Sequence, residues 1–274
     1  LQIALQSPAP WIAGIINFTP DSFSDGGQFV LAEQAIEFAE SNLSDANIID
    51  IGGEATGPGS APIAPEVELA RVLPLVTALA KKRFVSVDTY RASTADACLL
   101  AGAKMINDVS ALRADSELAS VVKAHSAYLV LMHSKEEGTA VHVSKKNKIY
   151  SDPIEDIKRS LSERVDYATR SGICQDQLLV DPGMGGFLSQ DPEVSWRVLK
   201  GLEVLSQHFA PIPLYIGTSR KGFLQCANRI IPQSERDPVS QLTAFIAATK
   251  GAKVIRTHNP KMAADFLAIL SKTI

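Results

Sequence analysis

The sequence contains few cysteines and none of the spacings that usually mark a metal site. Its 274 residues include three cysteines, Cys98, Cys174 and Cys226, and five histidines. No C-x-x-C, H-x-x-x-H or H-E-x-x-H pattern occurs, so the sequence offers no zinc site. Three widely separated cysteines cannot all pair with one another. We therefore expect reduced thiols, as in the cytoplasm.

An excess of one charge and a long apolar run are also lacking. Lys and Arg number 27 against 30 Asp and Glu, so there is no general positive field to hold a nucleic acid. The longest apolar runs, such as Ala127–Met132, fall far short of the roughly 18 residues that a membrane span needs. No charged-then-apolar leader opens the chain. We expect a cytoplasmic protein with no nucleic-acid and no membrane partner.

What the sequence does contain is a regular alternation of short apolar runs and longer helical stretches. The expected strands are Trp11–Ile16, Ala46–Ile51, Phe84–Val87, Lys104–Asn107, Ala127–Met132, Gln177–Val180, Pro213–Ile216 and Ala252–Ile255. The expected helices are Leu31–Leu43, Pro65–Ala80, Ala92–Ala101, Ser116–Ala124, Pro153–Ser171, Pro192–Ser206, Val239–Thr249 and Ala263–Ser271. Eight such units without a linker-like boundary predict one domain, residues 1–274, with the α/β fold of a (β/α)8 TIM barrel.

Glycines support this division of the chain. Gly102, Gly172 and Gly251 each stand between an expected helix and the next strand, where a left-handed helix cap favours glycine. A doubly wound open sheet is the alternative. Its first turn should carry G-x-G-x-x-G, but here the first strand is followed by Asn17-Phe18-Thr19-Pro20.

Polar residues gather at the expected carboxyl ends of the strands, where barrels of this type build their active sites. Asp88, Asn107 and Asp181 follow strands three, four and six and can accept hydrogen bonds from N–H donors. Lys221 and Arg256 follow strands seven and eight, where barrels commonly hold phosphate. A ligand with N–H donors at one end and phosphate at the other would match. For any one acid, a helix cap or an ion pair remains the alternative.

Two further residues have a structural interpretation beside a functional one. His133 follows an apolar strand and is more typical of a core histidine. Glu54 lies in a glycine-rich segment, where it can cap or pair while the surrounding loop bends.

Seven segments at expected strand ends carry a family resemblance. They are residues 14–27 (GIINFTPDSFSDGG), 50–54 (DIGGE), 86–89 (SVDT), 106–108 (IND), 131–133 (LMH), 181–183 (DPG) and 219–221 (SRK). In this order they resemble the dihydropteroate synthases of the pterin-binding (β/α)8 family, along nearly the whole chain. One segment alone would be weak evidence, whereas seven in order make chance an implausible explanation.

The resemblance implies a transferase of folate biosynthesis. Such an enzyme condenses 6-hydroxymethyl-7,8-dihydropterin diphosphate with p-aminobenzoate and gives 7,8-dihydropteroate and diphosphate. The family pattern places the pterin ring against Asp88, Asn107, Asp181 and Lys221. Asn17 would bind the Mg²⁺ carried by the diphosphate. The resemblance turns Lys221 toward the pterin, whereas the residue pattern alone assigns it to phosphate.

The same resemblance implies the remaining contacts and roles. The residues expected at the diphosphate are Thr56, Arg256 and His258. Asp25 would favour the cation left when diphosphate departs, with Phe23 packed on the aromatic amine. A helix starting at Gly222 would offer N–H groups to the benzoate carboxylate, and Met132 and Phe187 would line the substrates. The expected catalytic residues are Asp25, Lys221, Arg256 and His258.

Three segments depart from the family pattern. Gly57 stands where the second loop usually carries arginine, residues 184–189 (MGGFLS) replace a common Gly-Phe-Gly-Lys, and residues 256–260 (RTHNP) replace a frequent Arg-Val-His-Asp. Together with residues 132–134 (MHS), these segments resemble the sulfonamide-insensitive branch of the family. They bear on the acid-binding side and leave the pterin-binding residues unchanged.

Two other functions compete with the synthase. A methyltetrahydrofolate-dependent methyltransferase of the same family would need the pterin acceptors but no diphosphate clamp, so Arg256 and His258 argue against it. A non-catalytic pterin-binding paralogue is supported only by the missing loop arginine. The resemblance also implies a homodimer.

Overall fold

A computed structural model describes residues 9–18, 28–57, 59–225, 229–270 and 272. Eight parallel strands pair in chain order, and β8 pairs with β1 to close a barrel. The strands are β1 (Trp11–Asn17), β2 (Ile48–Gly52), β3 (Phe84–Asp88), β4 (Met105–Asp108), β5 (Tyr128–Met132), β6 (Leu178–Asp181), β7 (Leu214–Ile216) and β8 (Ala252–Thr257). The predicted (β/α)8 barrel is confirmed.

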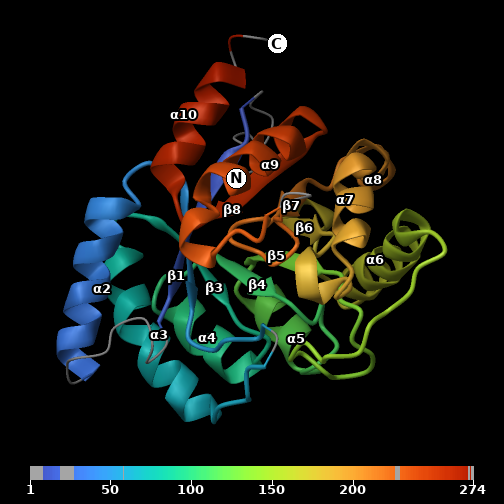
Figure 1. Ribbon diagram of the computed structural model, residues 1–274. Helices are drawn as coiled ribbons and strands as arrows, with labels where there is room; N and C mark the ends of the chain where they lie inside the picture. Colours follow the sequence, from blue (N-terminus) through green and yellow to red (C-terminus); the bar gives the residue numbers. More distant parts are fainter. Residues whose placement is uncertain (1–8, 19–27, 58, 226–228, 271, 273–274) are drawn as a thin grey trace.

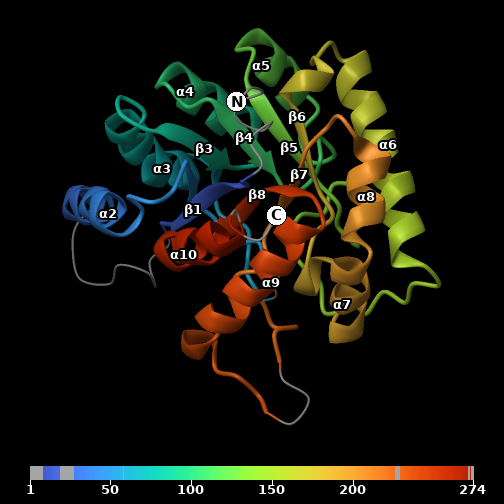
Figure 2. The ribbon, with the colours of Figure 1, turned by 90° about the horizontal axis from the view of Figure 1, so that it is seen from above.

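Helices surround this barrel (Figures 1 and 2). They are α2 (Gln28–Asn42), α3 (Pro65–Leu79), α4 (Ala92–Leu100), α5 (Leu118–Ala124), α6 (Pro153–Arg170), α7 (Pro192–Lys200), α8 (Leu202–Phe209), α9 (Asp237–Thr249) and α10 (Pro260–Leu270). Every residue of β2, β4 and β6 is buried, because these strands are covered by helices outside and by side chains inside the barrel. This explains why their sequences are apolar runs rather than alternating patterns.

One expected helix is divided in two. The sequence predicts a single helix over Pro192–Ser206, but Gly201 ends α7 and begins α8. Glycine is a weak helix former, and a Cβ at this position would lie 2.6 Å from Cδ1 of Ile154 on α6. The close approach of α6 therefore requires glycine at the break.

The predicted glycine caps are confirmed. Gly102, Gly172 and Gly251 have φ angles of 112°, 91° and 94°, in the left-handed region that an L side chain rarely adopts. Each one turns the chain from a helix into the strand that follows, or into the short turn before it.

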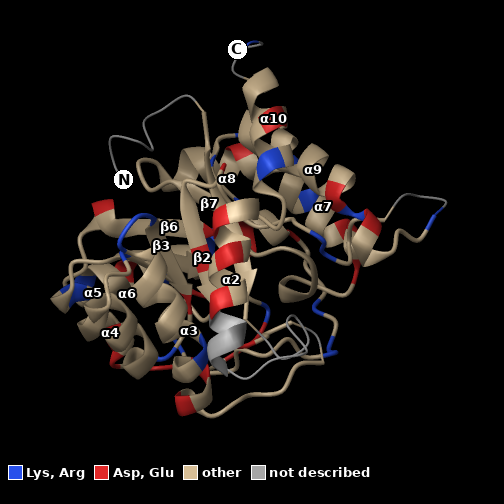
Figure 3. Ribbon diagram, turned by 90° about the vertical axis from the view of Figure 1, so that its left-hand side faces the viewer, with Lys and Arg blue, Asp and Glu red and all other residues tan. Residues whose placement is uncertain are grey.

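Acidic and basic residues are scattered over the side of the molecule shown in Figure 3, and no face of one sign gathers there. This distribution agrees with the formal net charge of −3. In the part of the chain that is described, no helix combines the length and apolarity that crossing a membrane requires.

Candidate active site

The carboxyl end of the barrel is organised around Arg256 on β8. Its Nε donates to Oδ2 of Asp50 on β2 at 2.6 Å, and its Nη2 donates to Oδ2 of Asp88 on β3 at 2.7 Å. Both bonds cross the barrel mouth from the last strand to the second and third. The expected separation of acceptors from cations is therefore wrong for the free protein, because the barrel closes β8 onto β1 and brings Arg256 within reach of both acids.

Asp50 connects this ion pair to a second expected site residue. Asn107 on β4 donates through Nδ2 to Oδ2 of Asp50 at 3.1 Å, so Asp50 holds both Arg256 and Asn107. The Asp50 side chain is completely buried. The sequence analysis assigned no site role to Asp50. The sequence does contain an indication of its role, because Asp50 is a single acid inside the apolar run Ile48–Ile51. A buried acid at such a position nearly always has a partner.

Asp181 and Lys221 form the opposite side of the same polar layer. Asp181 accepts from the backbone N–H of Gly183 at 2.7 Å, and Lys221 donates to the carbonyl of Met184 at 3.1 Å. Burial raises the pKa of Asp181 to about 6, with the Lys221 charge opposing the shift. Burial likewise lowers the pKa of Lys221 to about 8, and Asp181 opposes that shift. Lys221 therefore lies in the same layer as Asp181.

Burial also raises the pKa of Asp88, against the opposing charge of Arg256. The pKa of Arg256 itself is raised, because the charges of Asp50 and Asp88 outweigh the cost of burial. Arg256 therefore stays protonated across the physiological range and is the dominant cation of the site.

His258 lies beside this layer but carries no charge of its own at neutral pH. Its Nδ1 is 2.9 Å from Oγ of Ser219, the residue that begins the Ser-Arg-Lys segment. Burial and the charge of Arg256 lower its pKa to about 3. A neutral imidazole can offer a phosphate a hydrogen bond, but it cannot neutralise charge.

Binding of a ligand through its N–H donors to Asp181 and Asp88 should depend on pH, because burial raises the pKa of Asp181 to about 6 and that of Asp88 to about 7. Both carboxyls become protonated as pH falls from 7 to 5, so we expect the affinity for 6-hydroxymethyl-7,8-dihydropterin to weaken at least about tenfold over this range. Titration calorimetry across this range measures the slope. A raised carboxyl pKa acts on folding in the opposite sense: it stabilises the free protein at low pH, and this stabilisation is lost as pH rises through about 6. The weaker binding at low pH is therefore not caused by unfolding of the protein. An affinity that does not change between pH 7 and pH 5 would contradict the prediction.

A cavity of about 420 Å³ opens next to Lys221. Gly57, Phe187 and Ser189 line it together with Lys221 and Gly222, so the two loops that depart from the family pattern share one wall. Two further cations, Arg220 and Arg236, also line it. Arg220 makes two hydrogen bonds to Asp237, at 2.7 and 2.9 Å.

Met132 and Phe187 belong to one small apolar cluster above the barrel, built around Val109, Met132 and Val141. Phe187 also faces Lys221, whose Nζ is 4.8 Å from the centre of the ring. Phe187 therefore stands between the polar layer and the cavity. Gly183, which begins this segment, needs a φ of 69°, and a Cβ there would lie 2.3 Å from the carbonyl oxygen of His133.

The helix expected at Gly222 is wrong. Residues 222 and 223 form a turn, and the N–H of Leu224 returns to the carbonyl of Lys221 at 3.2 Å. Nothing lies within 4 Å of the place where a Cβ of Gly222 would stand, so the position is open toward the cavity. Phe23 and Asp25, whose roles are expected from the resemblance, lie outside the described residues.

The second loop is held by an ion-pair network that the sequence analysis did not identify. Arg91 binds Glu54 and, at 2.8 Å, Glu68 on α3, while His142 Nε2 lies 2.8 Å from Glu54. The expectation that Glu54 pairs is confirmed. Val143 lies in the long loop between β5 and α6, and its N–H donates to the carbonyl of Thr56 at 3.0 Å. This loop therefore packs on the second loop, where Thr56 is half-buried.

The structural interpretation of His133 is also confirmed. It is buried, its Nε2 is 3.4 Å from the hydroxyl of Tyr150, and burial lowers its pKa to about 3. Asp108 likewise has a structural role: its carboxylate accepts from the N–H groups of Ser110 and Leu112 in the loop that follows β4. Neither residue takes part in the polar layer of Arg256.

Asn17 is exposed at the end of β1, beside Gly52. Among the described residues there is no group of three His, Cys, Asp or Glu side chains placed to hold a metal. A single amide oxygen at an open barrel mouth fits Mg²⁺ that arrives with a diphosphate, because Mg²⁺ keeps several water ligands and is commonly held by one or two protein oxygens and substrate phosphates.

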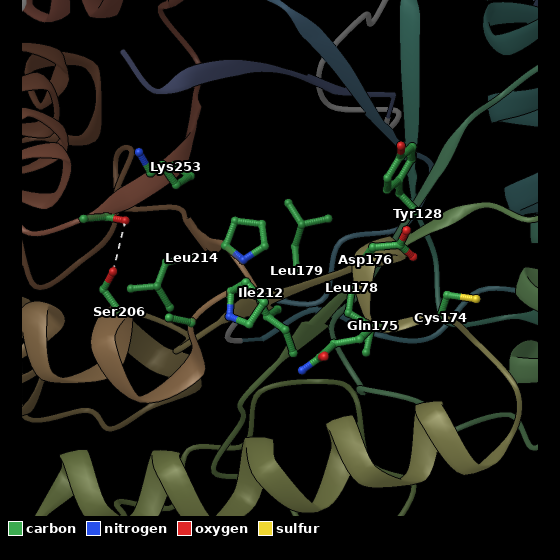
Figure 4. A pocket seen from close by; sticks show the side chains of 14 residues that line it. Tyr128, Cys174, Gln175, Asp176, Leu178, Leu179, Ser206, Ile212, Leu214 and Lys253 are labelled. Atoms are coloured by element: carbon green, nitrogen blue, oxygen red, sulfur yellow. Dashed lines mark hydrogen bonds between the residues drawn. The ribbon is translucent and has the colours of Figure 1, made fainter. Parts of the chain in front are cut away.

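A larger cavity, of about 620 Å³, lies at the opposite end of the barrel (Figure 4). Leu178, Leu179, Ile212 and Leu214 give it a largely apolar lining, with Asp176 and Lys253 among the polar residues there. None of the expected site residues lines it. Cavity volume alone therefore does not locate the candidate site. The position of the polar layer does.

Comparisons with known proteins agree with this geometry. The pterin binding enzyme family matches residues 13–258. Dihydropteroate synthase of Bacillus subtilis is 35% identical over 258 residues, covering 92% of this chain and 85% of that protein. Two structures of Xanthomonas albilineans dihydropteroate synthase, with 4-aminobenzoic acid and with 7,8-dihydropteroate, superpose with TM-scores of 0.88 and 0.85. Their identities are 32% and 31%, and each match covers 98% of this chain and 94% of the other. The chain therefore belongs to the pterin-binding enzyme family, among its dihydropteroate synthases, which are transferases.

Proposed function

We propose that the chain condenses 6-hydroxymethyl-7,8-dihydropterin diphosphate with p-aminobenzoate in folate biosynthesis. The observation that carries the proposal is the ring of Asp88, Asn107 and Asp181 with Lys221 and Arg256 at one end of the barrel. The X. albilineans relative binds 4-aminobenzoic acid in one structure and 7,8-dihydropteroate in another.

The pterin ring is assigned to the polar layer. Its aminopyrimidine edge carries several N–H donors, and Asp88, Asn107 and Asp181 supply acceptor oxygens on three neighbouring or nearby strands. In the free protein Arg256 occupies one oxygen of Asp88. Substrate binding therefore requires Arg256 to share Asp88 with the pterin or to leave it.

Arg256 has a second partner available in the substrate, namely its diphosphate. A guanidinium binds phosphate oxygens with paired hydrogen bonds, and the negative charge on the leaving group grows as the C–O bond breaks. Arg256 and the N–H of His258 are assigned to this group, with Thr56 beside them. Asn17 is the residue that would hold Mg²⁺, which neutralises part of the diphosphate charge when it is bound.

The p-aminobenzoate is assigned to the 420 Å³ cavity. Phe187 provides an aromatic wall beside the pterin layer, and Gly222 leaves open space at the outer side. Lys221, Arg220 and Arg236 make the lining positive, as a carboxylate requires. The amine would then face the methylene carbon from which diphosphate departs. The carbocation at that carbon is assigned to Asp25, and Phe23 to the aromatic amine.

The proposal also includes the oligomeric state and the location of the protein. As in the sequence analysis, we infer a homodimer in the cytoplasm. The buried Cys98 and the exposed Cys174 are free thiols, as expected in a reducing compartment.

The direct test of the activity is a turnover assay with both substrates and Mg²⁺, in which formation of 7,8-dihydropteroate is measured by chromatography. We expect product only when both substrates are present, and loss of turnover when the metal is chelated. Release of diphosphate without p-aminobenzoate consumption would point to a hydrolase. Binding of the pterin without turnover would point to the non-catalytic paralogue.

Restoring the missing loop arginine provides a prediction about the acid pocket. We expect Gly57→Arg to leave the melting temperature unchanged, because nothing lies within 4 Å of a Cβ there and the backbone is not left-handed. The expected change in KM for p-aminobenzoate is less than about threefold, since three cations already line the cavity and an additional solvated charge adds little.

Gly57→Ala is the matched control, because it makes the same backbone change without the charge. KM for p-aminobenzoate and Ki for a sulfonamide are measured in all three proteins. A tenfold gain in both affinities, in the arginine variant alone, would show that the loop has simply lost a contact rather than been remodelled with residues 184–189.

A further inference from the structure

A cluster of buried hydrophobic side chains forms the floor beneath the polar layer. Its members are Ala13, Ile48, Met105, Val130, Leu179, Tyr215 and Val254. Tyr215, on β7, is the only one that carries a hydroxyl, and it is fully buried. Within the described residues, that hydroxyl has no hydrogen-bond partner. An unpaired buried hydroxyl is costly, so its presence at this position calls for a functional explanation.

The hydroxyl lies next to the substrate-binding layer. Inward-facing residues on a strand recur every second position. The floor residues Ile48, Met105, Leu179 and Val254 are each followed, two positions on, by a polar site residue: Asp50, Asn107, Asp181 and Arg256, respectively. Tyr215 on β7 is in register with Val254, so its side chain lies in the floor directly below the acids and Arg256. Ser86, two positions before Asp88, is a second buried hydroxyl without a partner among the described residues.

Asp50 has the complementary unpaired atom. Its Oδ2 accepts from Arg256 and Asn107, while its Oδ1 is buried and has no partner among the described residues. Of the charges around Tyr215, that of Asp50 has the largest effect and raises the pKa of the phenol, in the same direction as burial. The phenol therefore stays protonated and can act as a donor.

The proposed function requires Arg256 to turn toward the diphosphate. Asp50 would then lose the cation it pairs with while remaining fully buried, which strongly disfavours that state. Among the described residues, Asn107 alone would remain as a donor to its Oδ2. A second hydrogen bond to Asp50, donated from the floor, would stabilise the state in which Arg256 has left it.

We propose that Tyr215 is a positioning residue that donates its hydroxyl to Oδ1 of Asp50 when Arg256 engages the diphosphate. It acts through Asp50 and Arg256 and does not touch the substrate. The inference rests on the proposed function. Its signature is selectivity: Tyr215 supports binding of the diphosphate-bearing pterin and has no effect on a pterin without diphosphate, which leaves Arg256 on Asp50.

The test compares Tyr215→Phe with Tyr128→Phe. Tyr128 is another inward-facing tyrosine, packed on Phe84 at the far end of the barrel, and so loses a hydroxyl away from the site. We expect Tyr215→Phe to raise KM for the diphosphate substrate about tenfold and to change Kd for 6-hydroxymethyl-7,8-dihydropterin less than twofold. The Tyr128 variant should match wild type in both measurements.

Equal losses for both pterins, or no loss for either, would overturn the proposal. The same selective loss in Ser86→Ala with none in Tyr215→Phe would overturn it as well, since the Ser86 hydroxyl is also buried without a partner and lies beside Asp50 in the β2–β3 register. Absence of turnover in wild type would instead contradict the proposed function.

Asp50→Asn provides a second variant if Tyr215→Phe does not fold. Removing the charge of Asp50 removes the need for a replacement donor and frees Arg256 from one acid. We expect inorganic pyrophosphate with Mg²⁺ to bind this variant several-fold more tightly than wild type. Equal or weaker binding would overturn the proposal.

Discussion

Asp181→Asn is expected to reduce kcat/KM for the pterin substrate about a hundredfold. In the proposed function the carboxylate accepts from N–H donors of the pterin, whereas an amide can present a donor of its own instead. Loss of a hydrogen bond to a charged group costs about 1.5–3 kcal/mol, and an unpaired buried donor adds about 1–3 kcal/mol. Steady-state kinetics with varied pterin measures the change. The fold should persist, because an amide oxygen can still accept from the N–H of Gly183.

Asp176→Asn is the matched control for this substitution. Asp176 is exposed at the other end of the barrel, where it lines the larger cavity. Its kinetics should equal those of wild type. If Asp181→Asn also keeps wild-type kinetics, its carboxylate has a structural role and the pterin assignment is wrong.

Arg256→Met is expected to show the second large effect, on both activity and stability. It leaves the buried Asp50 and the nearby Asp88 without their cation, and breaking a buried ion pair from one side typically costs about 3–5 kcal/mol. Turnover should fall at least a thousandfold, because the leaving diphosphate loses its principal cation. Denaturant unfolding and turnover, measured on the same preparation, test both expectations.

The pH dependence of this variant separates electrostatics from packing. Without Arg256 the pKa of Asp88 rises further above the unfolded value of 3.8, so acid stabilises the fold and the deficit against wild type grows as pH increases from 5 to 8. Arg159→Met, which breaks an exposed pair with Asp156 on α6, should cost almost nothing at any of these pH values. A deficit that is the same at pH 5 and pH 8 would show that lost packing, and not unpaired charge, is its cause.

The sequence predicts the fold well because short apolar runs alternate with helical stretches along the chain. The break at Gly201 was missed because it depends on the approach of Ile154 from α6, which no local pattern contains. The helix expected at Gly222 was carried over from the family and has no local signal of its own, and residues 222 and 223 form a turn instead.

The residues of the candidate site could be predicted from the sequence, but the hydrogen bonds between them could not. Strand ends identify Asp88, Asn107, Asp181 and Arg256, since each follows an apolar run. That Arg256 binds Asp88 is a contact across a closed barrel between residues 168 positions apart. Closure and strand register set that distance, so one-dimensional spacing could not reveal it. Asp50 and Tyr215 did carry a signal, as single polar residues inside apolar strands.

The most direct test of the central claim is a crystal structure of the protein with the pterin diphosphate and Mg²⁺. We expect the pterin N–H edge to lie within hydrogen-bond distance of Asp88, Asn107 and Asp181. We also expect the Arg256 guanidinium to bind a phosphate oxygen instead of Oδ2 of Asp50. A pterin bound away from these three residues, or an Arg256 that keeps both of its acid partners with the diphosphate in place, would contradict it.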